Sequence, residues 1–132
     1  MIVMLAALLL KVIIAFGIGV LWGLIVRIAL LTAKALLTKI HSVLAKKVGT
    51  RVFAGAVGKL AKEVEKEAIR TNNIKSAQAL LDELNGEGVV MAEINSDGTV
   101  DDKSIQILKA EEIDDHLEQL LTANQGQLIL EA

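Results

Sequence analysis

The segment from Glu93 to Ser104 carries the oxygen-rich spacing of a calcium-binding loop. Asn95, Asp97 and Asp101 stand at ligand positions of that pattern, and a glycine stands where such a loop turns. The pattern also requires aspartate at its first position and a bidentate glutamate at its last, and here these are Glu93 and Ser104. A plain hairpin turn is the first interpretation of these residues, and calcium binding by Asn95, Asp97 and Asp101 is the alternative.

The other residue patterns that carry chemistry are missing from the sequence. The chain has no cysteine, which excludes disulfides and thiolate metal sites. Glu112 and His116 lie one helical turn apart, but two ligands alone make a poor metal site. No glycine-rich phosphate loop ends in lysine, no Gly-x-Ser-x-Gly occurs, and no histidine is paired with a nucleophile. The sequence therefore predicts a protein that is not an enzyme and holds no cofactor.

Charge divides the chain into two unlike halves. The first 60 residues carry eight basic and no acidic residues, whereas the remainder carries six basic and all sixteen acidic residues. A basic segment beside an apolar one favours contact with anionic lipid headgroups, and the acidic half would stay off the membrane. Nucleic-acid binding is not expected, because the soluble half is acidic and the chain has only three aromatic residues.

Residues 12–31 are predicted to form a transmembrane helix. Fifteen uncharged residues separate Lys11 from Arg27, and the apolar run continues to residue 31. A rise of about 1.5 Å per residue places these two charges roughly 24 Å apart, so snorkelling side chains could bridge a hydrocarbon core of about 30 Å. A second register over residues 3–26 would hold Lys11 inside the bilayer at a cost. The expected anchors at the membrane interface are Lys11, Trp22, Arg27 and Lys34.

Small residues recur at intervals of four along this predicted helix. Ala15, Gly19 and Gly23 would share one face, where small side chains let two helices approach closely, so we expect helix–helix packing in a homo-oligomer. Glycine and alanine are also common in membrane helices that have no partner. Of the eight basic residues among the first 60, seven lie from Arg27 onward, and the positive-inside rule places the C-terminal part on the cytoplasmic or equivalent side.

The predicted fold is a mostly α, single-pass membrane protein in three segments. Residues 1–48 form the transmembrane helix, which continues into a long amphipathic helix, and residues 49–71 form a glycine-containing hinge and a short charged helix. Residues 72–132 form a small acidic α+β module. Its expected elements are a helix from residue 74, strands at 89–94, 105–109 and 127–130, a turn at 95–98, and a helix at 111–121.

The predicted arrangement combines three features that also occur together in a known class of proteins. These are an uncleaved apolar helix at 12–31, basic flanks and a small acidic module. In this arrangement the chain resembles the small integral membrane proteins of tailless phages with an internal lipid membrane, such as the corticoviruses. The resemblance implies many symmetric copies between a lipid bilayer and a capsid or other protein layer. It predicts a structural or assembly protein, in the setting of a virion membrane. A membrane-tethered adaptor that binds a cytoplasmic protein through residues 72–132 is the alternative, and a holin-type pore-former is a third.

Overall fold

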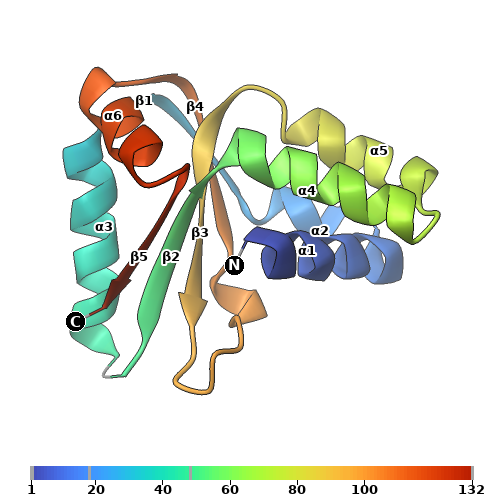
Figure 1. Ribbon diagram of the computed structural model, residues 1–132, viewed down its shortest axis with the longest axis horizontal. Helices are drawn as coiled ribbons and strands as arrows, with labels where there is room; N and C mark the ends of the chain where they lie inside the picture. The colour runs from blue at the N-terminus through green and yellow to red at the C-terminus, as the bar shows by residue number, and fades with distance from the viewer. Residues whose placement is uncertain (1, 18, 48, 132) are drawn as a thin grey trace.

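The computed structural model describes residues 2–17, 19–47 and 49–131, and for Leu21 and Trp22 it describes the backbone only. Helices and strands are interspersed along the described part of the chain (Figure 1). In chain order the elements are α1 (Ile2–Phe16), α2 (Gly19–Trp22), β1 (Ile25–Leu31), α3 (Ala33–Lys46), β2 (Arg51–Ala56), α4 (Val57–Arg70), α5 (Ile74–Glu83), β3 (Glu87–Ile94), the 3-10 turn η1 (Asp102–Ser104), β4 (Gln106–Ile113), α6 (Asp115–Ala123) and β5 (Gln127–Glu131).

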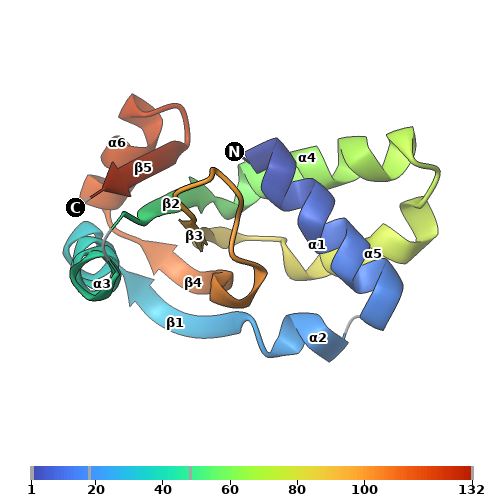
Figure 2. The ribbon, with the colours of Figure 1, turned by 90° about the horizontal axis from the view of Figure 1, so that it is seen from below.

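One five-stranded mixed sheet organises the molecule, in the order β1-β4-β3-β2-β5. β1 runs parallel to β4, and the other neighbouring strands are antiparallel. Helices α1, α4 and α5 cover one face, and α3 and α6 cover the other (Figures 1 and 2). Each face therefore has its own apolar core, as expected of a sheet between two helical layers.

The prediction of a transmembrane helix over residues 12–31 is wrong. Residues 12–16 complete the fifteen-residue α1, α2 is a single turn, and the rest of the segment includes strand β1. Among residues 2–17, 19–47 and 49–131, no helix has both the length and the apolar character needed to cross a bilayer. The mostly α, single-pass fold class is thereby corrected to an α+β fold built on a mixed sheet.

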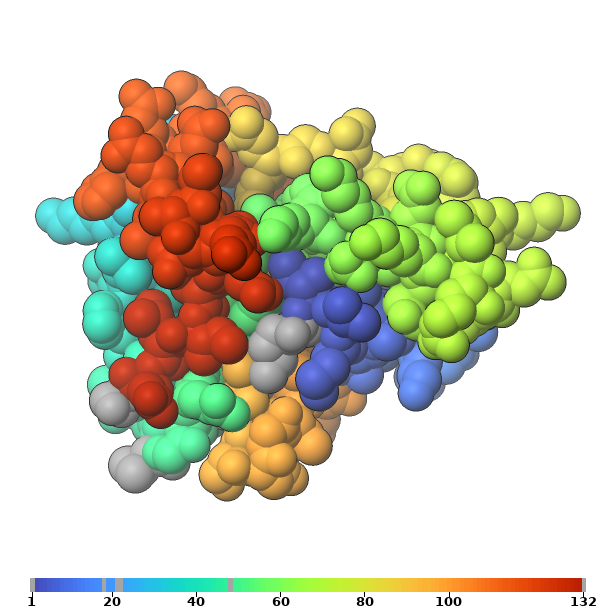
Figure 3. Space-filling view, viewed as in Figure 1, coloured from blue at the N-terminus to red at the C-terminus, as the bar shows by residue number. Residues whose placement is uncertain are grey.

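The apolar residues of α1 belong to the core. Leu5, Leu9 and Ile13 are buried with side chains of α4, α5 and the sheet. At the end of α1, Gly17 donates its N–H to the Ile13 carbonyl and adopts a φ of +83°, a left-handed conformation that suits glycine and ends helices. Figure 3 shows α1 at the surface between α4 and the loop that follows β3. The apolar run is therefore covered by protein along one side only.

The predicted amphipathic helix exists, but it is separate from α1. Thr32 caps α3 by accepting a hydrogen bond from the Ala35 N–H at 3.0 Å. The apolar side of α3, which includes Leu36, Ile40 and Leu44, is buried against the sheet. The long continuous helix was predicted because strand β1 and helix α3 are both rich in apolar residues, and β-branched residues favour a strand only when a partner strand is present.

Residues 51–56, which were expected within a hinge, form strand β2 between β3 and β5. The sheet thus draws strands from all three of the predicted segments. In the last segment the predicted strands and the turn at 95–98 are confirmed. The last helix begins at Asp115 instead of residue 111, because residues 111–113 extend β4 alongside β1.

At Gly88 on β3, an added side chain would collide with the backbone of β4. The φ of this glycine is +150°, and a Cβ atom at this position would lie 2.2 Å from the carbonyl oxygen of Leu108 on β4. That distance is far below van der Waals contact, so any side chain at residue 88 would push β3 away from β4.

Candidate functional site

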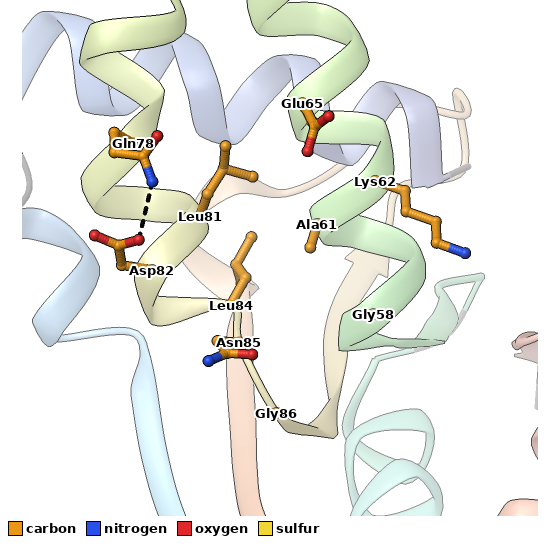
Figure 4. A pocket seen from close by; sticks show the side chains of 10 residues that line it. All are labelled: Gly58, Ala61, Lys62, Glu65, Gln78, Leu81, Asp82, Leu84, Asn85 and Gly86. Atoms are coloured by element: carbon orange, nitrogen blue, oxygen red, sulfur yellow. Dashed lines mark hydrogen bonds between the residues drawn. The ribbon is translucent and has the colours of Figure 1, made fainter.

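An open groove lies between α4 and α5 (Figure 4). It has a volume of about 720 Å³. Helix α4 contributes Lys62 and Glu65 to its walls, and α5 contributes Gln78 and Asp82, whose side chains are joined by a 3.0 Å hydrogen bond from the amide Nε2. The remaining lining residues are Gly58, Ala61, Leu81, Leu84, Asn85 and Gly86.

The side chains of this groove suit binding better than catalysis. Lys62, Glu65 and Asp82 are all exposed to solvent, and no histidine, serine or threonine lines the groove. A general base or nucleophile normally depends on burial or on an adjacent group that shifts its pKa, and the groove supplies neither a buried ionisable group nor a hydroxyl. The arrangement can make polar contacts with a partner's surface.

The candidate calcium ligands stabilise the turn after β3. An Asp97 carboxylate oxygen accepts hydrogen bonds from the Thr99 hydroxyl at 2.6 Å and from the Thr99 N–H at 3.0 Å. These bonds, the hydroxyl first, hold the pKa of Asp97 below its ordinary range. Asn95 donates to the Thr99 hydroxyl at 3.0 Å, and Asp101 accepts from the Lys103 N–H at 3.1 Å. Three of the turn's polar side chains are therefore bonded within the turn itself.

Among the residues that the structure describes, no three His, Asp or Glu side chains are grouped around one point, at this turn or elsewhere. Glu112 and His116, one turn apart if helical, lie on different elements, because Glu112 belongs to β4 and His116 to α6. Calcium binding at the turn stays a prediction.

Two exposed ion pairs shift the pKa values of their residues but do not form a functional site. Lys47 lies 2.8 Å from Glu93, and the hydrogen bond from its ammonium group to that carboxylate raises the pKa of Lys47. On α4, the guanidinium of Arg70 donates to Glu67 at 2.8 Å and lowers the pKa of that carboxyl. Exposed pairs of this kind contribute little to stability, so we assign them local structural roles.

The residues predicted to pack two membrane helices lie on different elements. Ala15 is in the last turn of α1, Gly19 begins α2, and Gly23 follows α2. All three are exposed, but they do not share the face of one continuous helix, because α1 ends at Phe16. Their predicted role in association is therefore not supported by a common helical stripe.

The predicted membrane anchors are also dispersed. Lys11 is exposed on α1, and Lys34 is exposed in the first turn of α3. Arg27 lies on β1 and reaches Glu83 of α5, with a separation of 3.7 Å between Arg27 Nη2 and Glu83 Oε2. Trp22 was also predicted to be an anchor, and its side chain lies outside the described part of the structure.

An exposed apolar group at the end of α1 and in α2 was missed by the sequence reasoning. Phe16 is 74% exposed and Ile14 is 48% exposed, and Val20 on α2 is also exposed. We call Ile14, Phe16 and Val20 the apolar end. Figure 2 shows α2 and the end of α1 together at one extremity of the molecule. Hydropathy alone could not separate these residues from Leu5 or Leu9, because all of them belong to one apolar run.

Strand β1 forms a second exposed apolar surface. It is an edge strand of the sheet (Figure 2). Its Val26 and Leu30 are 38% and 50% exposed. Together with the apolar end, this edge gives the N-terminal third two surfaces suited to contact with lipid or protein.

In comparisons with known proteins, the chain matches no family, no curated protein and no solved structure.

Proposed function

We propose that this chain is a structural, non-catalytic protein that attaches to the face of a lipid bilayer, associates with further copies of itself, and joins the bilayer to an adjoining protein layer. The observation that carries the proposal is the apolar end, where Phe16 leaves about three quarters of its surface in water within a folded domain. A solvent-exposed aromatic and aliphatic group of this kind is typical of a contact surface.

The surroundings of the apolar end favour lipid as its contact. A phenylalanine ring leaves water when the apolar side of a helix is buried at the boundary between headgroups and acyl chains. Lys11 is exposed on the same helix, and the first 60 residues carry no acidic side chain that would be repelled by anionic lipid. The proposed attachment is therefore superficial insertion of the apolar end, with basic residues beside the headgroups.

Sedimentation with lipid vesicles tests this attachment. Phe16 would transfer roughly 150 Å² of apolar surface, worth up to about 4 kcal/mol. We therefore expect the wild-type chain to sediment with vesicles of phosphatidylcholine and phosphatidylserine, and the Phe16→Gln variant to bind at least about tenfold more weakly. An uncharged replacement leaves the electrostatic attraction unchanged, so the loss reports the apolar contact alone.

Ile129→Gln is the matched control, because Ile129 is 47% exposed and lies on β5. Strand β5 is at the opposite edge of the sheet from β1, the strand that follows α2. This variant should bind vesicles as the wild type does. Absence of wild-type binding, or equal losses in the two variants, would contradict the proposal. Retention of a trapped dye by the same vesicles would separate surface attachment from the pore-forming alternative.

The groove between α4 and α5 favours a second candidate function, a membrane-associated adaptor. Gln78 and Asp82 of this groove belong to the segment 72–132 that was expected to bind a cytoplasmic protein. Abundance distinguishes the two functions. A structural protein should be present in many ordered copies in electron micrographs of the native membrane, whereas an adaptor should be scarce and should lose its partner in an Asp82→Lys variant.

A further inference from the structure

The turn that joins α4 to α5 exposes two isoleucines. Ile69 in the last turn of α4 is 63% exposed, and Ile74 at the start of α5 is 42% exposed. Among the large apolar side chains that the structure describes, Phe16 alone is more exposed than Ile69. We call residues 69–75, Ile-Arg-Thr-Asn-Asn-Ile-Lys, the α4–α5 turn. Two large apolar side chains at one exposed turn indicate a contact surface.

We propose that the α4–α5 turn inserts Ile69 and Ile74 into the same anionic lipid surface as the apolar end, so that the molecule stands end-on at the bilayer. This inference rests on the proposed attachment to lipid, to which it adds a second contact and an orientation. Helices α3 and α6 would then lie away from the lipid, toward the adjoining protein layer.

The α4–α5 turn and the apolar end lie at the same extremity of the molecule. Figures 1 and 2 share their horizontal axis, and both place the turn, α2 and the end of α1 on the right. Both views place α3 and α6 on the left. A flat surface that meets the right-hand extremity can therefore touch the turn and the apolar end together.

The charge of the α4–α5 turn suits anionic headgroups. Its two ionisable side chains, Arg70 and Lys75, are basic and exposed. Residues 68–81 contain no acidic residue, although the chain from residue 61 onward carries all sixteen of them. Arg70 is balanced by Glu67, at 2.8 Å, whereas Lys75 forms no ion pair with the acidic side chains that the structure describes. Lys75 therefore adds an unbalanced positive charge beside the isoleucines, which anionic lipid attracts.

Hydrogen bonds within the turn reduce the cost of moving it out of water. The backbone N–H groups of Thr71, Asn72 and Asn73 all donate to carbonyls of α4. The Thr71 hydroxyl donates to the Glu67 carbonyl at 2.7 Å, and the Asn73 amide donates to the Thr71 carbonyl at 3.1 Å. Polar groups that leave water without a partner are costly, and these groups already have one. The turn is therefore suited to superficial insertion.

The outward side of α1 is less suited to lie flat on the bilayer. Val3, Met4 and Ile14 are exposed there. At about 100° per residue, Lys11 falls on the same face of the helix as these three. A flat orientation would press its ammonium group toward the acyl chains, which is costly. An end-on orientation leaves Lys11 out of the acyl chains.

Sedimentation with vesicles of phosphatidylcholine and phosphatidylserine tests the second contact. The double variant Ile69→Gln with Ile74→Gln should bind at least about tenfold more weakly than the wild type, because both uncharged replacements remove apolar surface from the contact. Met4→Gln is the matched control, since Met4 is 50% exposed and would stay in water in the end-on orientation. It should bind as the wild type does.

Charge reversal tests the orientation. Lys75→Glu should weaken vesicle binding at least about fivefold in 0.1 M salt, because a basic residue near anionic headgroups contributes about that factor. Lys39→Glu makes the same change at an exposed position of α3, at the other extremity. Its effect should stay below about twofold, since salt confines the attraction to about 10 Å.

A fluorescent label reports insertion without relying on a loss of binding. The natural chain has no cysteine, so an environment-sensitive fluorophore can be attached to a single cysteine in Ile74→Cys, Met4→Cys or Ile129→Cys. On addition of vesicles, the emission of the label at residue 74 should move to shorter wavelength. Labels at residues 4 and 129 should not respond.

Sedimentation velocity without lipid tests a second copy as the alternative occupant of the turn. A wild-type dimer that is lost in the isoleucine double variant would show that the turn is covered by protein, and would overturn the proposal. Unchanged vesicle binding by the double variant, equal losses in Lys75→Glu and Lys39→Glu, or equal responses of the labels at residues 4 and 74 would also overturn it.

Urea unfolding shows whether each variant is folded, and the label at residue 74 decides the question alone if the double variant is not. A loss of vesicle binding in Phe16→Gln without a loss in the isoleucine double variant would remove this inference and keep attachment through the apolar end. Absence of wild-type binding would remove both.

Discussion

Replacing Leu9 by alanine should strongly destabilise the fold, because α1 is part of the core and not a separate membrane helix. Leu9 is 1% exposed and lies in the apolar cluster that α1 shares with α4, α5 and the sheet. A transmembrane helix projecting from a folded module would not transmit such a change to the module. The substitution therefore tests the position of α1 directly.

The expected magnitude follows from the burial of this side chain. Removing three carbon atoms from a fully buried leucine costs the lost transfer free energy plus the energy of the cavity, together about 2–5 kcal/mol. A free-energy change of 1 kcal/mol moves the melting temperature of a domain of this size by about 4 °C. The melting temperature should fall by roughly 8–20 °C.

Ile14→Ala is the matched control on the same helix. Its side chain is 48% exposed, so its free energy of unfolding should change by less than about 1 kcal/mol. Both variants can be followed by urea unfolding, monitored by circular dichroism at helical wavelengths. Equal stability of the wild type and Leu9→Ala, or equal losses in Leu9→Ala and Ile14→Ala, would refute the placement of α1 in the core.

Two further predictions concern the backbone and pH. Gly88→Ala should destabilise the chain by at least about 3 kcal/mol, because its Cβ would collide with a β4 carbonyl, whereas Gly58→Ala on α4 has open space and should stabilise it by about 0.5–1 kcal/mol in the same unfolding assay. The lowered pKa of Asp97 means that its stabilising effect is present above the ordinary pKa of 3.8 and is lost as pH falls through the lower, folded-state value. Thr99→Val removes the hydroxyl that contributes most and should raise this pKa toward 3.8 in a carboxyl NMR titration, and an unchanged titration would contradict that cause.

The C-terminal half was the more predictable part of the fold. Its strands alternate with turn residues, and the turn at 95–98 has the asparagine, aspartate and glycine that local hydrogen bonds require. Helix α5 follows Asn73 as expected, although its start is not capped by a side-chain hydrogen bond. These elements depend mostly on interactions between residues close in sequence, and such interactions can be inferred from the sequence pattern.

The N-terminal half shows where local patterns are insufficient. Residues 25–31 are apolar at nearly every position, which fits a membrane helix and a buried strand equally well. The choice is made by β4, about eighty residues later, because its backbone groups complete the hydrogen bonds of β1. The same holds for β2. Its glycine suggested a hinge, but pairing with β3 and β5 makes it an interior strand of the sheet.

The candidate site residues were likewise only partly predictable from the sequence. The individual residues Lys11, Ala15 and Arg27 could be selected from their types, but their positions could not, because each was placed on one long helix that the fold does not contain. The apolar end and the β1 edge could be identified only from the structure, because only the structure shows which apolar residues are buried and which are exposed.

By itself, the sequence determined that the N-terminal third is apolar and basic, that the rest is acidic, and that the residue sets of common catalytic sites are missing. These properties belong to composition and to short spacings. Only the tertiary structure decided which apolar residues are enclosed: Leu5, Leu9 and Ile13 face α4, α5 and the sheet, whereas Phe16, Val26 and Leu30 face outward. The physical reason is that burial depends on which distant segments cover a side chain, whereas the hydropathy of a residue is the same whether the side chain is covered or exposed.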